Sequence, residues 1–186
     1  MRQEEEALVR RAMQRDQEAF GRIYEANFDR IYRYIVLKIG NEAEAEDMTQ
    51  QVFLNALKSI SSYKSQGAPF SAWLYRIAHN QVVDHYRKKS KRPDTLPDDP
   101  PVELASTDEG IDPQKIAEHG MTMEQVMMAA RELTDAQREV ISLRFTSDLS
   151  VAEVANIMGR SQGAVKALQH SAILALRKAL VVETYE

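Results

Sequence analysis

The stretch that decides the fold reads SVAEVANIMGRSQGAVKALQHSAILAL and spans residues 150–176. Ser150 and Glu153 have the spacing of a capping box, a pair of side chains that binds free backbone amides at a helix start. Ser161 predicts the start of a second helix, and only residues 158–160 separate the two helices. A short helix, a tight glycine turn and a longer helix are typical of a helix-turn-helix, although any helical hairpin can show the same pattern.

The rest of the chain also has helical periodicity. Thr134 and Gln137 form another capping box, so the C-terminal part should hold three helices. In the N-terminal part, Asp16 is placed to cap a helix and Gly40 to end it. Three apolar faces are predicted there: Phe20, Ile23, Tyr24, Phe28, Ile31, Ile35 and Ile39; Met48, Val52, Phe53, Ala56, Leu57 and Ile60; and Trp73, Leu74, Ile77, Ala78 and Val82, in a helix beginning at Ser71.

A proline-rich and acidic stretch divides the chain. Residues 92–101 read RPDTLPDDPP, and prolines disfavour helix because they lack an amide donor. We therefore predict an all-α protein of two small helical domains, joined by a flexible acidic linker that contains proline. The predicted domains are residues 1–92 and 121–186, with residues 93–120 as the linker, and the helix-turn-helix belongs to the second domain.

Composition excludes several classes of protein. The 186 residues include no cysteine, so disulfides and thiolate metal sites are excluded. No apolar run approaches the ~20 residues of a membrane span, and we expect a cytoplasmic protein without membrane insertion. The net charge of −4 is unevenly spread: residues 1–92 carry +4, residues 93–124 carry −8 and residues 125–186 are neutral. The basic N-terminal part is therefore compatible with a nucleic-acid partner.

The helix predicted from Ser71 has an unusual polar side. Opposite its apolar face it carries Arg76, His79, Asn80, Tyr86, Arg87 and Lys88. Cations neutralise phosphates, amides read base edges and aromatic rings stack on unpaired bases, so the mixture suits nucleic acid. The alternative is a solvated basic face, with Trp73 in the core.

Three stretches resemble one known family. Phe70-x-x-Trp73-Leu74-Tyr75-Arg76-Ile77-Ala78-x-Asn80-x-x-x-Asp84-x-x-Arg87 resembles the promoter-reading helix of extracytoplasmic-function (ECF) sigma factors, short members of the sigma-70 family of transcription initiation factors. Residues 45–53, AEDMTQQVF, are similar to the helix with which the family binds polymerase. Residues 133–177 are similar to its C-terminal helix-turn-helix domain. The resemblance covers roughly residues 5–92 and 121–180.

The resemblance implies partners and site residues. An ECF sigma factor binds core RNA polymerase through the β′ and β subunits, recognises promoter DNA, and is often held by an anti-sigma factor. It needs no cofactor or metal. The implied polymerase-binding residues are Glu46, Asp47, Gln50 and Gln51, with Phe53 in the core. The implied -10 residues are Tyr63, Lys64, Arg76, Asn80, Arg87 and Lys88, and the implied -35 residues are Arg160, Ser161, Gln162, Lys166, Gln169 and His170.

The chain departs from the family pattern in its last helix. After Val165-Lys166 many members place Ser-Arg-Leu-x-Arg, whereas residues 167–171 here read ALQHS. Two expected arginines are therefore absent, and we expect weaker phosphate anchoring at the -35 element. The linker is either a simple tether or, by the resemblance, a segment that threads toward the polymerase cleft.

Other functions remain as alternatives. A one-component regulator would bind duplex DNA through the helix-turn-helix and use the N-terminal part as a sensor. A protein-interaction module would use the N-terminal part only for docking. An enzyme is the weakest alternative, because the four histidines are scattered and neither a zinc-binding HExxH nor a phosphate-binding glycine loop occurs.

Overall fold

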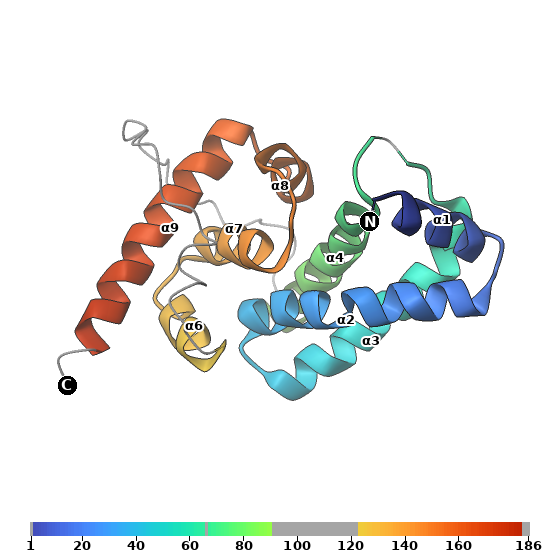
Figure 1. Cartoon of the computed structure of the whole chain (residues 1–186). Coiled ribbons are helices and arrows are strands. Elements are labelled where there is room, and N and C mark those ends of the chain that lie inside the picture. Colours follow the sequence, from blue (N-terminus) through green and yellow to red (C-terminus); the bar gives the residue numbers. More distant parts are fainter. Residues whose placement is uncertain (1, 66, 91–122, 184–186) are drawn as a thin grey trace. The chain divides into compact units, whose positions relative to one another are not determined.

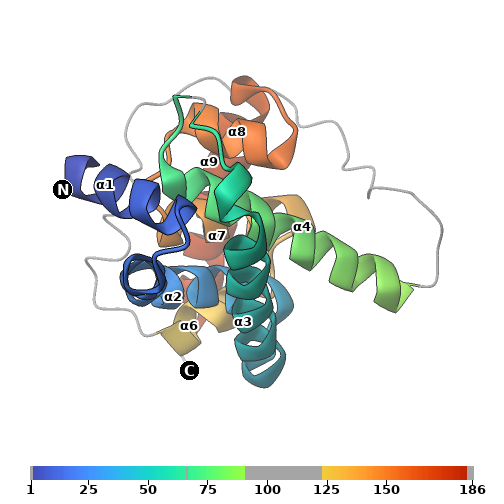
Figure 2. The same cartoon turned by 90° about the vertical axis from the view of Figure 1, so that its right-hand side faces the viewer.

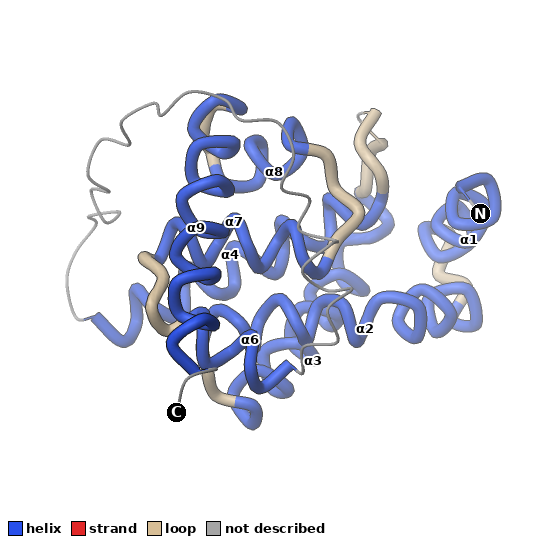
Figure 3. The backbone as a smooth tube through the Cα atoms, turned by 60° about the vertical axis from the view of Figure 1, so that its left-hand side comes forward, coloured by secondary structure: helices blue, strands red, loops and turns tan. Residues whose placement is uncertain are grey.

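The computed structural model describes residues 2–65, 67–90 and 123–183. The chain divides into two compact units, residues 1–91 and residues 92–186, and each is described here by itself (Figure 1). Within the described ranges, every regular element is a helix (Figure 3). The all-α prediction is thus confirmed for these ranges, while the predicted linker, residues 93–120, lies outside them.

In its described residues, 2–65 and 67–90, the first unit holds four α-helices and one short 3-10 helix. The α-helices are α1 (Arg2–Met13), α2 (Gln17–Ile39), α3 (Glu42–Ser59) and α4 (Phe70–Ser90), and the 3-10 helix η1 (Ile60–Ser62) directly follows α3. Helix α2 packs against α1 and α3, and α4 contacts both α2 and α3 (Figure 2). The loop between η1 and α4 lies beside α1, and this placement forms the cavity described below.

The predicted helix boundaries of α2 are confirmed. The Asp16 carboxylate accepts a hydrogen bond from the Ala19 amide at 3.0 Å, which satisfies a free donor at the helix start. Gly40 ends the helix with φ +69°, a left-handed conformation that costs glycine little. Asn41 then caps α3 by accepting from the Glu44 amide at 3.0 Å. Consecutive residues therefore stop one helix and start the next.

The core of the first unit is apolar and centred on two tyrosines. Tyr34 of α2 and Tyr75 of α4 are buried, and their rings meet edge to face at 5.6 Å. Phe53 is buried, as predicted. The other large side chains that are almost fully buried in this unit are Ile31, Ile35, Val36, Val52, Leu74 and Val82.

Two residues predicted to face this core are exposed instead. Tyr24 is 37% exposed and Leu57 is 49% exposed. Each directly follows a buried residue, Ile23 or Ala56, and neighbours on an α-helix point roughly 100° apart. The core contacts the face of each helix that carries Ile23 or Ala56, and the face with Tyr24 or Leu57 stays outside it. The apolar faces predicted for α2 and α3 were therefore too wide.

The described part of the second unit, residues 123–183, holds α6 (Met123–Ala130), α7 (Asp135–Thr146), α8 (Val151–Met158) and α9 (Gln162–Glu183). Both predicted capping boxes are present, at the starts of α7 and α8. Gly159 ends α8 with φ +65°, so the short glycine turn of the helix-turn-helix is confirmed. Helix α9 packs on α6, α7 and α8 and buries Val165, Leu168, Ala172, Ile173 and Leu176.

The sequence patterns missed two helices, α1 and α6. Helix α1 reads RQEEEALVRRAM, and of its apolar residues only Val9 and Ala12 are buried. Helix α6 is joined to α7 by Arg138, whose guanidinium donates to the carbonyl oxygens of Ala130 and Leu133 at 3.0 and 3.1 Å. Both helices depend on contacts with their neighbours more than on a periodic pattern of their own. Helix α4 also begins at Phe70, one residue earlier than predicted.

Candidate nucleic-acid interface

An exposed stripe runs along α3. Glu46, Asp47 and Gln50 are exposed, while Met48 and Val52 of the same helix are buried and fix it on the core. The predicted polar surface is therefore accessible on one side of α3. It is continued by Leu54 and Leu57, which are 50% and 49% exposed.

The apolar end of this stripe was not predicted. Asp47, Gln50, Leu54 and Leu57 follow one another at steps of three, four and three, so they share one face of the helix. That spacing was the available signal, but we assigned Leu57 to the core. A partner for this face therefore needs an apolar patch beside its polar groups.

Gln51, unlike Gln50, is engaged inside the unit. Its side-chain amide donates to Asn55 Oδ1 at 3.0 Å, and the Asn55 amide donates to Gln81 Oε1 of α4 at 3.3 Å. The second bond joins α3, which carries the predicted polymerase-binding residues, to α4, which carries most of the predicted -10 residues. Gln51 is half-buried, and its bond to Asn55 lies within α3 and supports the side chain that reaches α4.

Three aromatic rings gather where the loop meets α4. The ring of Tyr63 lies 5.2 Å from those of Phe70 and Trp73, and these two lie 5.2 Å from each other. Phe70 is buried, whereas Tyr63 and Trp73 are half-buried. Burial raises the pKa of the Tyr63 hydroxyl above its ordinary value of 10, so it stays protonated at neutral pH. Trp73, which the alternative interpretation placed in the core, packs against both other rings and remains half-buried.

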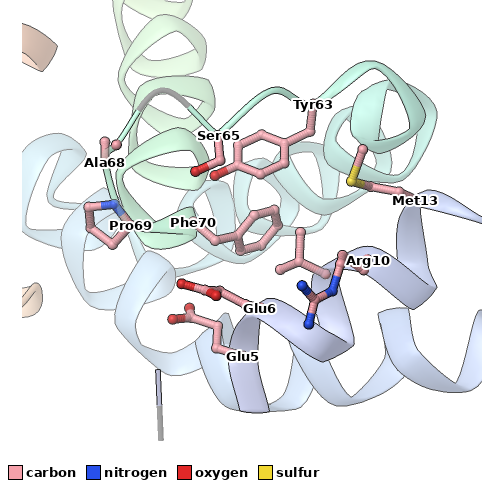
Figure 4. A pocket seen from close by; sticks show the side chains of 11 residues that line it. Glu5, Glu6, Arg10, Met13, Tyr63, Ser65, Ala68, Pro69 and Phe70 are labelled. Carbon is pink, nitrogen blue, oxygen red and sulfur yellow. The ribbon is translucent and has the colours of Figure 1, made fainter. Parts of the chain in front are cut away.

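A cavity of about 440 Å³ lies between α1 and this loop (Figure 4). Helix α1 supplies one wall with Glu5, Glu6, Val9, Arg10 and Met13. The loop and the start of α4 supply the other with Tyr63, Ser65, Gly67, Ala68, Pro69 and Phe70. Aromatic, acidic and basic side chains thus meet in one open site.

The outward side of α4 carries most of the predicted -10 residues. Arg76, Asn80, Arg87 and Lys88 are exposed, and Lys64 is exposed on the preceding loop. The Arg87 guanidinium lies 3.1 Å from the Asp84 carboxylate, one turn earlier on the same helix. Such an exposed pair is weak, so Arg87 can exchange it for a phosphate.

Two residues near the end of α4 are tied to other helices. Tyr86, which we predicted on the nucleic-acid side, donates its hydroxyl to the Lys38 carbonyl oxygen of α2 at 2.5 Å. Lys89 bonds the Glu44 carboxylate of α3 at 3.1 Å, and His85 Nε2 lies 3.3 Å from the same carboxylate. Tyr86 and Lys89 therefore anchor this end of α4.

The predicted -35 residues lie at the start of α9. Arg160, Ser161, Gln162 and Lys166 are exposed, and the Ser161 hydroxyl accepts from the Ala164 amide at 3.2 Å to cap the helix. Gln169 and His170 are half-buried. The first turns of α9 thus present polar groups, while Val165 and Leu168 hold the helix on its core.

In the part of the chain that the structure describes, no three His, Cys, Asp or Glu side chains gather closely enough to hold a metal ion. In the same part, no helix is both long and apolar enough to cross a membrane.

Comparison with known proteins identifies the family. The Sigma-70 region 2 family matches residues 23–92, and the Sigma-70, region 4 family matches residues 129–178. The chain is 33% identical over 182 residues to the ECF RNA polymerase sigma factor SigW of Bacillus subtilis, and the match covers 92% of this chain and 94% of that protein. It is 37% identical over 173 residues to the ECF RNA polymerase sigma factor BldN of Streptomyces coelicolor, covering 93% of this chain but 64% of the length of BldN.

These matches place the chain in the sigma-70 family of transcription initiation factors. Both relatives belong to one branch, and their similarity extends through both units of the chain. The chain is a member of that branch, the ECF RNA polymerase sigma factors.

Solved structures show the same fold. CnrH, solved in complex with the cytosolic domain of CnrY, has a TM-score of 0.67 and 23% identity, covering 95% of this chain and 96% of its own. The sigma factor RpoE of Bartonella quintana, solved in complex with the anti-sigma factor NepR, has a TM-score of 0.64 and 20% identity, covering 88% of this chain and 97% of its own.

Proposed function

We propose that this ECF sigma factor holds core RNA polymerase through α3, reads the -10 element through the loop and α4, and reads the -35 element through α9. The observation that carries the proposal is the placement of the polar residues on these three helices. Most residues of each set are exposed, on a helix or beside one whose opposite face is packed in the core of its own unit. The functional domains are then residues 1–92 and 121–186, with residues 93–120 as the linker.

The polymerase-binding surface is formed by Glu46, Asp47 and Gln50, with Gln51 supporting it through Asn55. Leu54 and Leu57 extend it with exposed apolar area, which favours association because it is removed from water. The acidic end would face basic groups on the β′ subunit. Charge complementarity of this kind sets orientation and association rate more than total affinity.

The -10 element would be bound as a partly unpaired strand. Flipping a base out of the stack costs a few kcal/mol, which stacking and hydrogen bonds in a protein pocket must offset. Tyr63 provides a half-buried ring, while Arg76 and Asn80 lie exposed on α4. Lys64, Arg87 and Lys88 would hold phosphates, a contribution that weakens as salt is added.

The -35 element would be read in the major groove by the start of α9. Arg160, Gln162 and Lys166 are exposed where a recognition helix enters the groove. Ser161 leaves backbone amides at the helix start available to a phosphate. Leu168 and Ser171 stand where many members of the family carry arginine, and neither side chain can neutralise a phosphate, which supports weaker anchoring there.

An anti-sigma factor is the proposed regulatory partner. It would cover the exposed face of α3, because that surface combines apolar and acidic residues that polymerase also needs. Support comes from the RpoE structure of similar fold, which was solved with the anti-sigma factor NepR. We propose a cytoplasmic site of action, where RNA polymerase and promoter DNA are found.

The test is reconstitution with core polymerase. The purified chain is mixed with bacterial core RNA polymerase, and initiation is scored on a promoter library. Initiation from sites that share two spaced elements supports the proposal and defines both elements. Binding of the chain to duplex DNA in the absence of polymerase, without initiation, would favour a one-component regulator instead.

A further inference from the structure

An apolar side chain lies in the middle of the predicted -10 face of α4. Val83 is 40% exposed, whereas Val82 directly before it is buried in the core of the unit. Successive steps of four, three and four residues separate Arg76, Asn80, Val83 and Arg87, so these exposed side chains share one face of the helix. Val83 is therefore an apolar member of an otherwise polar face that points away from the core.

Neither the core nor the helix accounts for valine at this position. A side chain exposed to this extent adds little to the core of its unit. A β-branched side chain also loses rotamer freedom in a helix, so alanine or a long polar residue would stabilise α4 more. Single exposed apolar residues are common on protein surfaces, and their surroundings decide what they contact. The neighbours of Val83 therefore indicate its use.

The charges on this face separate places for phosphates from a place for a base. Arg76 and Arg87 stand toward its two ends, roughly 16 Å apart along the helix axis at 1.5 Å per residue. Their guanidinium groups are suited to phosphates. Between them, the Asp84 carboxylate lies 3.1 Å from Arg87 and belongs to the residue after Val83. A carboxylate repels a phosphate, so the middle of the face favours a base edge over the sugar-phosphate backbone.

On the basis of the proposed -10 function, we propose that Val83 contacts the 5-methyl group of one thymine in the -10 element and selects thymine at that position. Among the four bases only thymine presents this methyl group, and apolar side chains recognise it by direct contact. The contact removes apolar area from water on both partners. Asn80, one turn earlier, has an amide that both donates and accepts, so it is suited to the polar atoms of the same or the adjoining base.

The experiment compares thymine with deoxyuridine, which differs from it only in lacking the 5-methyl group. Each thymine of the -10 element is replaced in turn, and initiation is measured at limiting reconstituted holoenzyme with wild type and with Val83→Ala. Wild type should lose about fourfold at one position, the effect expected when one methyl-sized group is no longer buried. Val83→Ala should show no difference between the two bases at that position and keep every other base preference.

Two further variants serve as controls. Val83→Ile keeps a branched apolar side chain at the same place, so it should retain the sensitivity to the methyl group. Leu174→Ala shortens another apolar side chain, on α9 of the second unit, where leucine is 49% exposed. Its response to deoxyuridine should match wild type. Because Val83 carries no charge, Val83→Ala should also leave the salt dependence of promoter binding unchanged.

Two results would overturn the inference. One is a wild-type chain that selects promoters without thymine in the -10 element, or that initiates equally from thymine and deoxyuridine at every position. The other is a sensitivity to the methyl group that Val83→Ala retains; weaker polymerase binding by that variant would then assign Val83 to a protein contact. Both leave the proposed function intact, because specific initiation persists. Failure of the wild-type chain to initiate on any promoter would reject the proposed function and this inference with it.

Discussion

At the scale of single residues, the loss of a predicted polymerase contact and the loss of a predicted phosphate contact should affect different binding steps. Asp47 lies exposed on α3, where a charge steers a partner. Lys166 lies exposed on the second turn of α9, where by the proposed function its charge would neutralise a phosphate. Each can be replaced without disturbing a packed side chain, so binding and stability separate cleanly.

Asp47→Lys should weaken binding to core polymerase about tenfold and leave thermal unfolding unchanged, because it reverses one charge on the exposed stripe. Titration of labelled core polymerase measures the affinity. Glu25→Lys is the control, as it reverses an exposed charge on α2 away from that stripe. An affinity equal to wild type would remove Asp47 from the polymerase-binding surface.

Lys166→Ala should weaken initiation that depends on the -35 element and lower the slope of log affinity against log salt by about 1. Dependence on the -10 element should change less. Lys178→Ala removes the same charge from an exposed position near the other end of α9 and should leave both unchanged. Equal losses at the two elements would contradict the assignment of Lys166 to the -35 element.

At the scale of elements, the residues at helix ends fix the orientation of the helices that carry the proposed DNA-binding residues. Asp16 lies at the end of the turn that follows α1 and caps the start of α2. Its carboxylate also lies 2.7 Å from the Arg11 guanidinium. Gly159 separates α8 from α9 in a backbone conformation that other residues adopt at a cost. The contribution of each helix end to the stability of the protein can therefore be measured without polymerase or DNA.

Asp16→Ala should lower the melting temperature, and the effect should depend on pH. The Ala19 amide and then the Arg11 guanidinium hold the pKa of the Asp16 carboxyl below its ordinary value of 3.8. The stabilisation is therefore complete above that value and is lost as the pH falls through the lowered value. Melting curves at neutral and at strongly acidic pH check this, with Asp29→Ala as control. A difference from wild type that grows on acidification would contradict it.

Gly159→Ala and Gly163→Ala should have opposite effects on stability. Gly159 has φ +65°, so alanine there is strained and should destabilise the second unit by about 1 kcal/mol. Gly163 lies in α9, where an added Cβ would contact only Ser161 Oγ at 3.9 Å. Alanine there should stabilise by roughly 0.5–1 kcal/mol. Chemical denaturation measures both; a destabilised Gly163→Ala would show that the site has constraints beyond its backbone.

At the scale of the whole molecule, sequence patterns predicted the helices with strong local signals. Capping residues and left-handed glycines marked the ends of α2, α7 and α8, because these interactions involve residues close in the chain. Helices α1 and α6 were not predicted, because their few buried residues are stabilised by contacts with other helices and form no periodic pattern. For the same reason, sequence alone could not show that Leu57 is exposed or that Asn55, held by Gln51, bonds Gln81 of α4.

In the candidate site, as in the fold, only features with a local sequence signal could be predicted. Exposed polar residues on α3, α4 and α9 were predictable from motifs that lie within one helix. The cavity was not, because Glu5 and Tyr63 are far apart in the chain and are brought together only by packing of α1 against η1 and α2. Tertiary contacts of this kind leave no local pattern in the sequence.

The measurement that tests the central claim most directly is promoter-specific initiation by this chain with core RNA polymerase. The account predicts that core polymerase alone does not initiate at the selected sites, and that adding the chain starts transcription from promoters with two spaced elements. Asp47→Lys should reduce this at limiting polymerase. Binding to polymerase that never yields specific initiation, on any member of a full promoter library, would contradict the account.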